Sequence, residues 1–249
     1  MNGQADYVFL HGGGQGGWVW DETITALDRQ THGGFGRALA LDAPGCGRKR
    51  DRQTEHLTMQ DVARELVADI EDAGMKDVIL VPHSQGGQAA AFMVELQPRL
   101  FKRVVHVSCS IPLLGQTVQD MMGTSVHGGS EDEVGWPFDP STTDIATAGF
   151  PLMFCNDMDA ALSASFMAKL GQDAWPAQTY TLTDWRLDHL ADVPATFVIC
   201  LRDNIIPAGW QEKFAQRFRT DRQVRIDAGH QAMTTRPHAL AEILRHEAA

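Results

Sequence analysis

Ser84 stands where a nucleophile would be expected. It follows a short apolar run at 78–81, and Gly86 and Gly87 come before a helix-forming stretch. This order predicts a strand, a sharp turn and a helix, with the serine oxygen pointing away from the backbone at the apex of the turn. The alternative is an ordinary strand-to-helix turn with a surface serine. A nucleophilic hydroxyl needs a base, so the rest of the chain can be searched for one.

His230 is the predicted base. It follows a glycine just past the strand-like segment 224–226 and precedes the helix-like segment 237–247. A single histidine is more often structural, but the carboxyl ends of parallel strands open at one edge of a sheet, where Ser84 is also expected. There it could take the serine proton and later protonate a leaving group.

Asp203 is the predicted acid that orients His230. It follows the strand-like segment 196–201, whereas the segment that ends at 107 is followed by no carboxylate. Helix capping or a pair with Arg202 would be an alternative role for Asp203. Asp227 is a weaker rival, because it lies too close to His230 in sequence to approach the ring from behind.

Two backbone N–H groups are expected to bind the negative charge that develops on a carbonyl oxygen. One is that of Gln85, directly after the serine. The other is that of Gly13, in the glycine-rich loop after the strand-like segment 7–10. Its neighbours Gly12 and Gly14 let the backbone approach a bound carbonyl and are expected to contact substrate.

Short apolar strands alternate with helices over most of the chain. The expected strands are 7–10, 38–41, 78–81, 104–107, 196–201 and 224–226, and the expected helices are 18–29, 58–73, 86–97, 210–218 and 237–247. Thr58 and Asp61 have the spacing of a helix N-terminal cap. This alternation predicts an α/β fold with a mostly parallel sheet of about six strands, flanked by helices.

The segment 112–190 breaks this rhythm, because it is too long for a loop and too irregular for another strand–helix unit. We expect it to form a cap inserted into a core made of 1–111 and 191–249. Some of its aromatic residues should line an apolar pocket, although most could form the core of the cap itself. The candidate substrate-binding side chains are Trp136, Phe154, Trp175 and Trp185, together with Gln231 from the core.

Four blocks together resemble the α/β-hydrolase superfamily. They are His11-Gly12-Gly13-Gly14, Asp42-Ala43-Pro44-Gly45-Cys46-Gly47, His83-Ser84-Gln85-Gly86-Gly87, and the pair Asp203 and His230. The first loop and the acid loop are similar to those of small carboxylesterases, the branch that includes plant methylesterases and hydroxynitrile lyases. The resemblance implies hydrolysis of a carboxylic ester or lactone through an acyl-enzyme, with no metal and no cofactor. Pro82 departs from the family pattern, which has glycine there.

Two further residues bear on the type of reaction. The lyases of this branch carry threonine after the first-loop histidine and lysine after the catalytic histidine, whereas this chain has Gly12 and Gln231. Both differences favour hydrolysis. A non-hydrolytic reaction on the same fold, lyase-like or cofactor-free, is the alternative, because the fold alone does not fix the chemistry.

A dinucleotide-binding protein is a more remote alternative. Residues 12–17 also satisfy the pattern G-x-G-x-x-G after a strand, and Asp42 ends the next strand. This interpretation leaves Ser84, His230 and Asp203 without a role.

The composition limits the classes of partner that we expect this protein to bind. The net charge is -11 and no basic cluster offsets it, which argues against nucleic acid and anionic membranes. We find neither a signal-peptide pattern nor an apolar run long enough to span a membrane. The four cysteines form no C-x-x-C pair and suit a reducing compartment, so we expect a cytoplasmic protein. The expected partner is a small ester or lactone with an apolar part, and a homodimer is left open.

Overall fold

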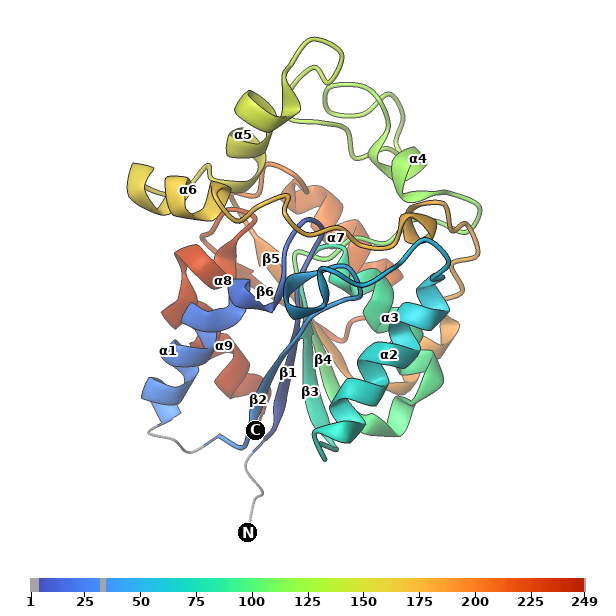
Figure 1. Cartoon of the computed structure of the whole chain (residues 1–249), viewed down its shortest axis with the longest axis vertical. Helices are drawn as coiled ribbons and strands as arrows, with labels where there is room; N and C mark the ends of the chain where they lie inside the picture. Colours follow the sequence, from blue (N-terminus) through green and yellow to red (C-terminus); the bar gives the residue numbers. More distant parts are fainter. Residues whose placement is uncertain (1–4, 32–34, 249) are drawn as a thin grey trace.

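Six strands form one parallel sheet at the centre of the molecule (Figure 1). The structure is a computed structural model that describes residues 5–31 and 35–248. The strand order is β2-β1-β3-β4-β5-β6. The strands are β1 (Tyr7–Leu10), β2 (Ala38–Leu41), β3 (Val78–Pro82), β4 (Phe101–Val107), β5 (Ala195–Cys200) and β6 (Arg222–Ile226).

Alternate residues of the central strands supply the two layers of the core. In β1, Tyr7 and Phe9 pack into the layer that contains Leu240, and Val8 and Leu10 pack into the opposite layer. Side chains of a strand alternate between the faces of its sheet, so a strand covered on both sides is apolar throughout. Every residue of β1, β3 and β5 is buried.

Helices cover both faces of the sheet. Figure 1 shows α1 and α9 on one side and α2 and α3 on the other. The helices around the sheet are α1 (Asp21–Thr31), α2 (Met59–Asp72), α3 (Gly86–Leu96), α7 (Ala208–Arg217), α8 (Ala232–Thr235) and α9 (Pro237–Glu247). The predicted α/β fold class, with a parallel sheet of six strands flanked by helices, is confirmed.

Helix α2 shows how closely local sequence and structure agree. Thr58 is its N-cap, and the Thr58 hydroxyl and the Asp61 carboxylate satisfy each other's backbone N–H groups, as predicted. Val62, Leu66 and Ile70 are fully buried along one face of the helix. Strand β4, in contrast, begins at Phe101 rather than at 104, because Lys102 and Arg103 interrupt the apolar pattern without ending the strand.

Most of the chain between β4 and β5 lies over the carboxyl edge of the sheet (Figure 1), and its last part, with the 3-10 helix η6 (Asp188–Asp192), returns along α3. It contains α4 (Val118–Met122), the π-helical turn η4 (Ile145–Gly149), α5 (Phe150–Phe154) and α6 (Ala160–Met167), joined by irregular segments. Most of the segment predicted as a cap, 112–190, belongs to the part above this edge. Its position places it directly above the loops in which the candidate catalytic residues were expected.

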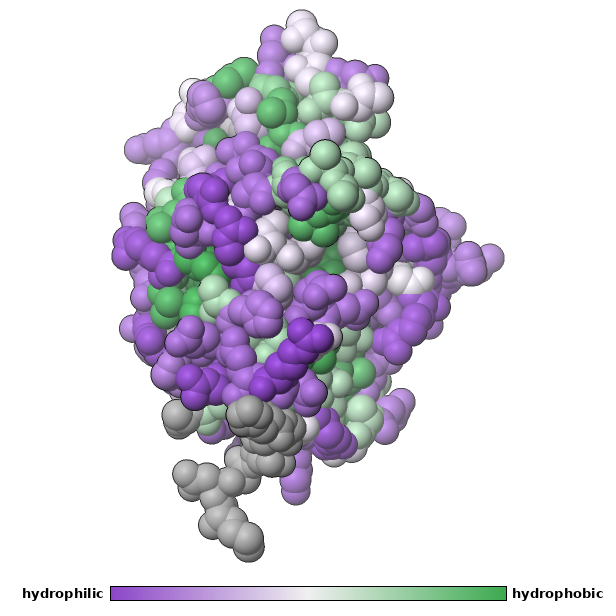
Figure 2. Space-filling view, turned by 90° about the vertical axis from the view of Figure 1, so that its left-hand side faces the viewer, coloured by the Kyte–Doolittle hydropathy of each residue, from purple (hydrophilic) through white to green (hydrophobic). Residues whose placement is uncertain are grey.

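The face of the molecule that carries α1, α6 and α8 is largely polar. Figure 2 shows the side of the molecule that carries α1, α6 and α8, where hydrophilic residues dominate and hydrophobic patches are small. Across residues 5–31 and 35–248, none of the helices is both long and apolar enough to cross a lipid bilayer.

Candidate active site

Ser84 occupies a strained turn between β3 and α3. Its φ angle is 50°, in the left-handed region that residues with a side chain seldom adopt. The two following glycines make the turn possible. A Cβ atom at Gly86 would lie 2.7 Å from the backbone oxygen of His11, and one at Gly87 would lie 2.6 Å from the Cβ atom of Cys109. The strand, the turn and the helix therefore cross at a distance that only glycine permits.

Pro82 is compatible with this turn. It is the last residue of β3 and is buried. The residues that follow it tie the end of the strand to both neighbours, since His83 N donates to Leu10 O at 2.9 Å and Ser84 N donates to Val107 O at 3.2 Å. The sharp turn therefore forms with proline where the family pattern has glycine.

The side chains of Ser84, His230 and Asp203 lie in one hydrogen-bonded line. The distance from His230 Nε2 to Ser84 Oγ is 3.0 Å, and that from His230 Nδ1 to Asp203 Oδ2 is 2.6 Å. His230 is 1% exposed and Asp203 is 6% exposed, so water is largely excluded from their contact. The three residues come from the ends of β3, β5 and β6. This geometry lets the imidazole accept the serine proton while the carboxylate stabilises the resulting cation.

The Asp203 carboxylate is fixed by backbone N–H groups. Its Oδ1 atom accepts hydrogen bonds from the N–H groups of Ile205 at 2.8 Å and Ile206 at 2.9 Å. Oδ2 remains directed at His230. Asp203 therefore contacts His230 and does not pair with Arg202, whose guanidinium lies 2.7 Å from Asp227.

Ser108 is a member of this site that the sequence analysis missed. Its hydroxyl donates to Asp203 Oδ2 at 2.5 Å, and its φ angle of 43° holds it in that position directly after β4. The signal in the sequence was its place after a central strand, at the edge where the other site residues were expected. At that position the expected group is a carboxylate, whereas Ser108 supplies a hydroxyl that contacts one.

His83 contacts both the backbone and the ring of His230. Its Nε2 atom lies 2.9 Å from the backbone oxygen of His230, and the two ring centroids are 4.5 Å apart. Burial, together with the neighbouring imidazole of His230, lowers the pKa of His83 well below its usual value. A neutral His83 ring donates from Nε2 to the carbonyl and keeps the His230 loop in place.

The two expected oxyanion donors are available. Within the described part of the chain, the backbone N–H groups of Gly13 and Gln85 have no hydrogen-bond partner. The loop that carries Gly13 is held from behind, because Gly12 O accepts from His11 Nδ1 at 2.8 Å and from Trp175 Nε1 at 3.1 Å. Fixed donors of this kind are what stabilise a developing oxyanion.

Gly12 and Gly14 lie on either side of that donor. A Cβ atom at Gly12 would be 2.9 Å from Ser84 Cβ, so the glycine leaves room for the Ser84 side chain. Gly14 has a φ angle of 67°, and its carbonyl accepts the N–H of Gly171 at 3.0 Å. Gly14 therefore ties the glycine-rich loop after β1 to the layer above the sheet.

A cavity of about 170 Å³ opens in front of Ser84. Of the predicted pocket residues, Trp136 and Phe154 line it. Much of the rest of the wall is apolar and consists of Val118, Met121, Met122, Met153, Ile205 and Ile206.

Trp175 and Trp185 are not among the lining residues, unlike the sequence-based expectation. Both rings are buried in the hydrophobic core, and both indole N–H groups are already bound. Trp185 donates to Gln116 O at 2.8 Å and packs against Phe92. Trp175 holds Gly12, as described above. Gln231 is also fully buried and does not line the cavity. It lies at the N-terminus of α8.

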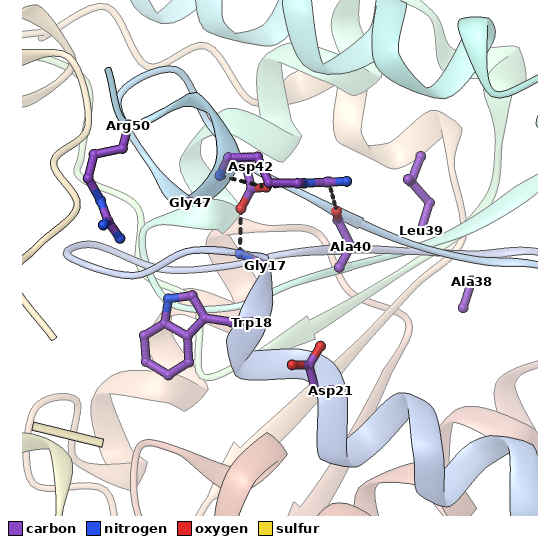
Figure 3. Close-up of a pocket in the computed structure, with 10 residues that line it drawn as sticks. Gly17, Trp18, Asp21, Ala38, Leu39, Ala40, Asp42, Gly47 and Arg50 are labelled. Atoms are coloured by element: carbon purple, nitrogen blue, oxygen red, sulfur yellow. Dashed lines mark hydrogen bonds and ion pairs between the residues drawn. The ribbon is translucent and has the colours of Figure 1, made fainter. Parts of the chain in front are cut away.

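A larger hollow of about 520 Å³ lies beside the edge strand β2, away from Ser84 (Figure 3). Of its four charged side chains, Asp42, Arg48 and Arg50 are already paired, and the fourth is Asp21. Asp42 accepts from Gly17 N at 2.7 Å and from Arg48 Nε at 2.7 Å, and Arg50 pairs with Asp173 at 2.8 Å. Asp42, which a dinucleotide site would direct at a ribose, is thus engaged with the protein itself.

Comparisons with known proteins agree with this architecture. A model of the alpha/beta hydrolase family matches residues 7–243. Methylesterase 9 of Arabidopsis thaliana is 24% identical over 252 residues, covering 96% of each chain. Among solved structures, an extracellular alpha/beta-hydrolase from a Paenibacillus species gives a TM-score of 0.75 at 20% identity, covering 97% of this chain and 98% of that one. Polyneuridine aldehyde esterase gives 0.73 at 18%, covering 99% and 100%.

Proposed function

This chain belongs to the α/β-hydrolase family, and we propose that it is a serine hydrolase that cleaves a carboxylic ester or lactone. The observation that carries the proposal is the line of contacts from Ser84 through His230 to Asp203, with distances of 3.0 Å and 2.6 Å. The relative named a methylesterase and the structure named an esterase support ester cleavage as the reaction class.

In the proposed acylation, Ser84 Oγ attacks the carbonyl carbon of the ester while His230 Nε2 takes the hydroxyl proton. The imidazolium then gives that proton to the alkoxy oxygen as the bond between carbon and leaving group breaks. The acyl group stays on Ser84, and an alcohol departs. In a lactone the leaving oxygen remains attached to the acyl chain.

Deacylation repeats these steps with water as the nucleophile. His230 takes a proton from water as its oxygen attacks the acyl carbon, and returns the proton to Ser84 Oγ as the acid is released. Asp203 stabilises the imidazolium in both halves. The N–H groups of Gly13 and Gln85 would bind the oxyanion each time it forms.

The alternative lyase-like reaction receives less support from this site. The lyases of the resembling branch place a threonine where this chain has Gly12, and a Cβ atom there would already lie 2.9 Å from Ser84 Cβ. They also place a lysine where this chain has Gln231, which is uncharged and buried. Both features favour a hydrolytic site over one that handles a released anion.

A direct test combines turnover with covalent labelling. The purified protein is assayed with a panel of short-chain nitrophenyl esters, and it is treated with a serine-reactive phosphonate before mass spectrometry of the peptides. We expect hydrolysis, and a phosphonyl adduct on the peptide that contains Ser84. Ser84→Ala should abolish both signals. Retention of most activity in Ser84→Ala, or absence of turnover with every ester, would overturn the proposal.

A further inference from the structure

Three glutamine side chains face the catalytic cavity with unused hydrogen-bonding capacity. Gln15, Gln85 and Gln88 all line it. Gln15 is fully buried, and neither its amide nitrogen nor its amide oxygen has a hydrogen-bond partner within residues 5–31 and 35–248. The Gln88 oxygen and the Gln85 nitrogen likewise lack partners among the described residues, and both atoms are buried.

Within the protein, these amide atoms have few other groups with which to form hydrogen bonds. Much of the facing wall is built from valine, methionine, isoleucine and phenylalanine side chains, which cannot bond an amide at ordinary strength. The indole N–H of Trp136 already donates to Gly123 O at 2.8 Å, and the polar groups left in the lining are those of Ser84, Ser110 and His230. Buried polar groups in native proteins are almost always bonded to protein, to water or to a ligand. Gln85 illustrates the first solution, because its oxygen accepts from the Tyr180 hydroxyl at 3.1 Å. Gln15 has no such partner, although its side chain is among those that line the cavity.

The unpartnered glutamine atoms indicate which functional groups a ligand in this cavity should carry. Gln15 presents one donor and one acceptor side by side, and Gln88 adds an acceptor. A group that carries both an N–H and a C=O matches this arrangement with two parallel hydrogen bonds. Apart from His230, the cavity lining contains no basic side chain, so a carboxylate would enter without a counter-ion. The arrangement therefore favours a neutral group.

We propose that the cavity selects esters that carry a neutral carboxamide or lactam group, which pairs with the side chain of Gln15 and is completed by Gln88. This inference rests on the proposed esterase function and names its substrate class. The cavity of about 170 Å³ limits the size of that group. Since a cavity of about 150 Å³ holds one benzene molecule, the bound part should be no larger than one substituted six-membered ring.

Four methyl esters of nearly equal shape test the proposal. They end in a carboxamide (methyl 4-amino-4-oxobutanoate), a methyl ketone (methyl 4-oxopentanoate), an isopropyl group (methyl 4-methylpentanoate) and a carboxylate (monomethyl succinate). We expect kcat/KM to be about tenfold or more higher for the carboxamide than for the isopropyl ester, with the ketone between them and the carboxylate lowest. A second pair, the acetate of 3-hydroxypropanamide and 3-methylbutyl acetate, places the same groups on the alcohol side.

Variants show which side chains cause the preference for the carboxamide ester. Gln15→Met keeps the length of the side chain but removes the amide, and it should bring the carboxamide-to-isopropyl ratio close to one. Gln88→Met should lower the same ratio and serves if Gln15→Met does not fold. Gln231→Met is the matched control, because that glutamine is also buried with both amide atoms unpartnered in the described chain but does not line the cavity. It should keep the ratio of the unsubstituted protein.

The failure of this inference can be distinguished from the failure of the proposed function. Calorimetric titration of Ser84→Ala with the same esters measures affinity without turnover, so the preference can be measured even if no ester is hydrolysed. Equal or weaker binding of the carboxamide in both series would overturn the inference, as would a ratio that Gln15→Met leaves unchanged. Those results would mean that the glutamines bind only water.

Discussion

The Ser108 hydroxyl donates to the same carboxylate oxygen of Asp203 that contacts His230. The distance from Ser108 Oγ to Asp203 Oδ2 is 2.5 Å, and that from His230 Nδ1 to this oxygen is 2.6 Å. The Oδ1 atom is held separately by the N–H groups of Ile205 and Ile206. The carboxylate is therefore bound at both oxygens, and the side chain cannot rotate away from the histidine without losing several charge-assisted bonds.

Removing the Ser108 hydroxyl should impair the orientation of the histidine. We expect Ser108→Ala to lower kcat for an ester substrate about tenfold and to change KM little, because the lost bond supports His230 rather than substrate. Steady-state kinetics measures both constants. Ser108→Gly is the matched variant, since glycine tolerates the φ angle of 43° that strains alanine. It should lose the same activity but unfold at higher denaturant concentration than Ser108→Ala. Full activity in both variants would exclude a role for the hydroxyl.

Neutralising Asp203 should lower kcat far more than removing the Ser108 hydroxyl does. Asp203→Asn retains an oxygen that can accept from the backbone N–H groups of Ile205 and Ile206, so the loop should still fold. The charge that stabilises the imidazolium is lost, and we expect kcat to fall about 10³- to 10⁴-fold. The rival carboxylate provides the control. Asp227 pairs with Arg202 and its side chain is 75% exposed, so Asp227→Asn should leave ester hydrolysis unchanged. The reverse pattern would assign the acid to Asp227.

The positions of Ser84, His230 and Asp203 could be predicted because topology fixes them. Each follows a strand, and parallel strands bring their carboxyl ends to one edge whatever the side-chain packing is. Ser108 also follows a strand, but its contact with Asp203 depends on a backbone conformation with a φ angle of 43°. That conformation cannot be predicted from the sequence.

The roles of the tryptophans depend on packing and could not be predicted from their residue type. Trp136 lines the cavity, whereas Trp175 directs its indole N–H at Gly12 O, on a loop more than a hundred residues away in sequence. Both positions come from the irregular segment between β4 and β5, where no hydrophobic period predicts which side of a residue faces the site.

Gly12 should be intolerant of any side chain. An alanine Cβ atom there would lie 2.9 Å from Ser84 Cβ and 3.1 Å from His83 Nδ1, so the loop or the nucleophile must move. Displacements of about 1 Å can lower turnover about 10²-fold, and we expect a loss of this order in kcat for Gly12→Ala. In Gly209→Ala, the control, the new Cβ would meet no described atom within 4 Å. That variant should retain full activity, and equal activity of the two variants would contradict the prediction.

His106 should make the stability of the protein depend on pH. Its ring is stacked on Phe218 at a centroid distance of 4.1 Å, and burial lowers its pKa from 6.5 to about 3. Above pH 6.5 the ring is neutral in both the folded and the unfolded chain and contributes no pH dependence. Below pH 6.5 the unfolded chain binds a proton that the folded protein does not, so the free energy of unfolding decreases as the pH falls.

At pH 5 this linkage amounts to about 2 kcal/mol for His106, since each pKa unit corresponds to about 1.4 kcal/mol. The pKa values of His11 and His83 are also lowered by burial, so they act in the same direction. In His106→Phe the difference in unfolding free energy between pH 7 and pH 5 should shrink by about 2 kcal/mol, as measured by urea denaturation at both pH values. His246→Gln, which changes an exposed histidine, should leave that difference as it is. An unchanged difference in His106→Phe would mean that the His106 ring is protonated to the same extent in the folded and the unfolded chain.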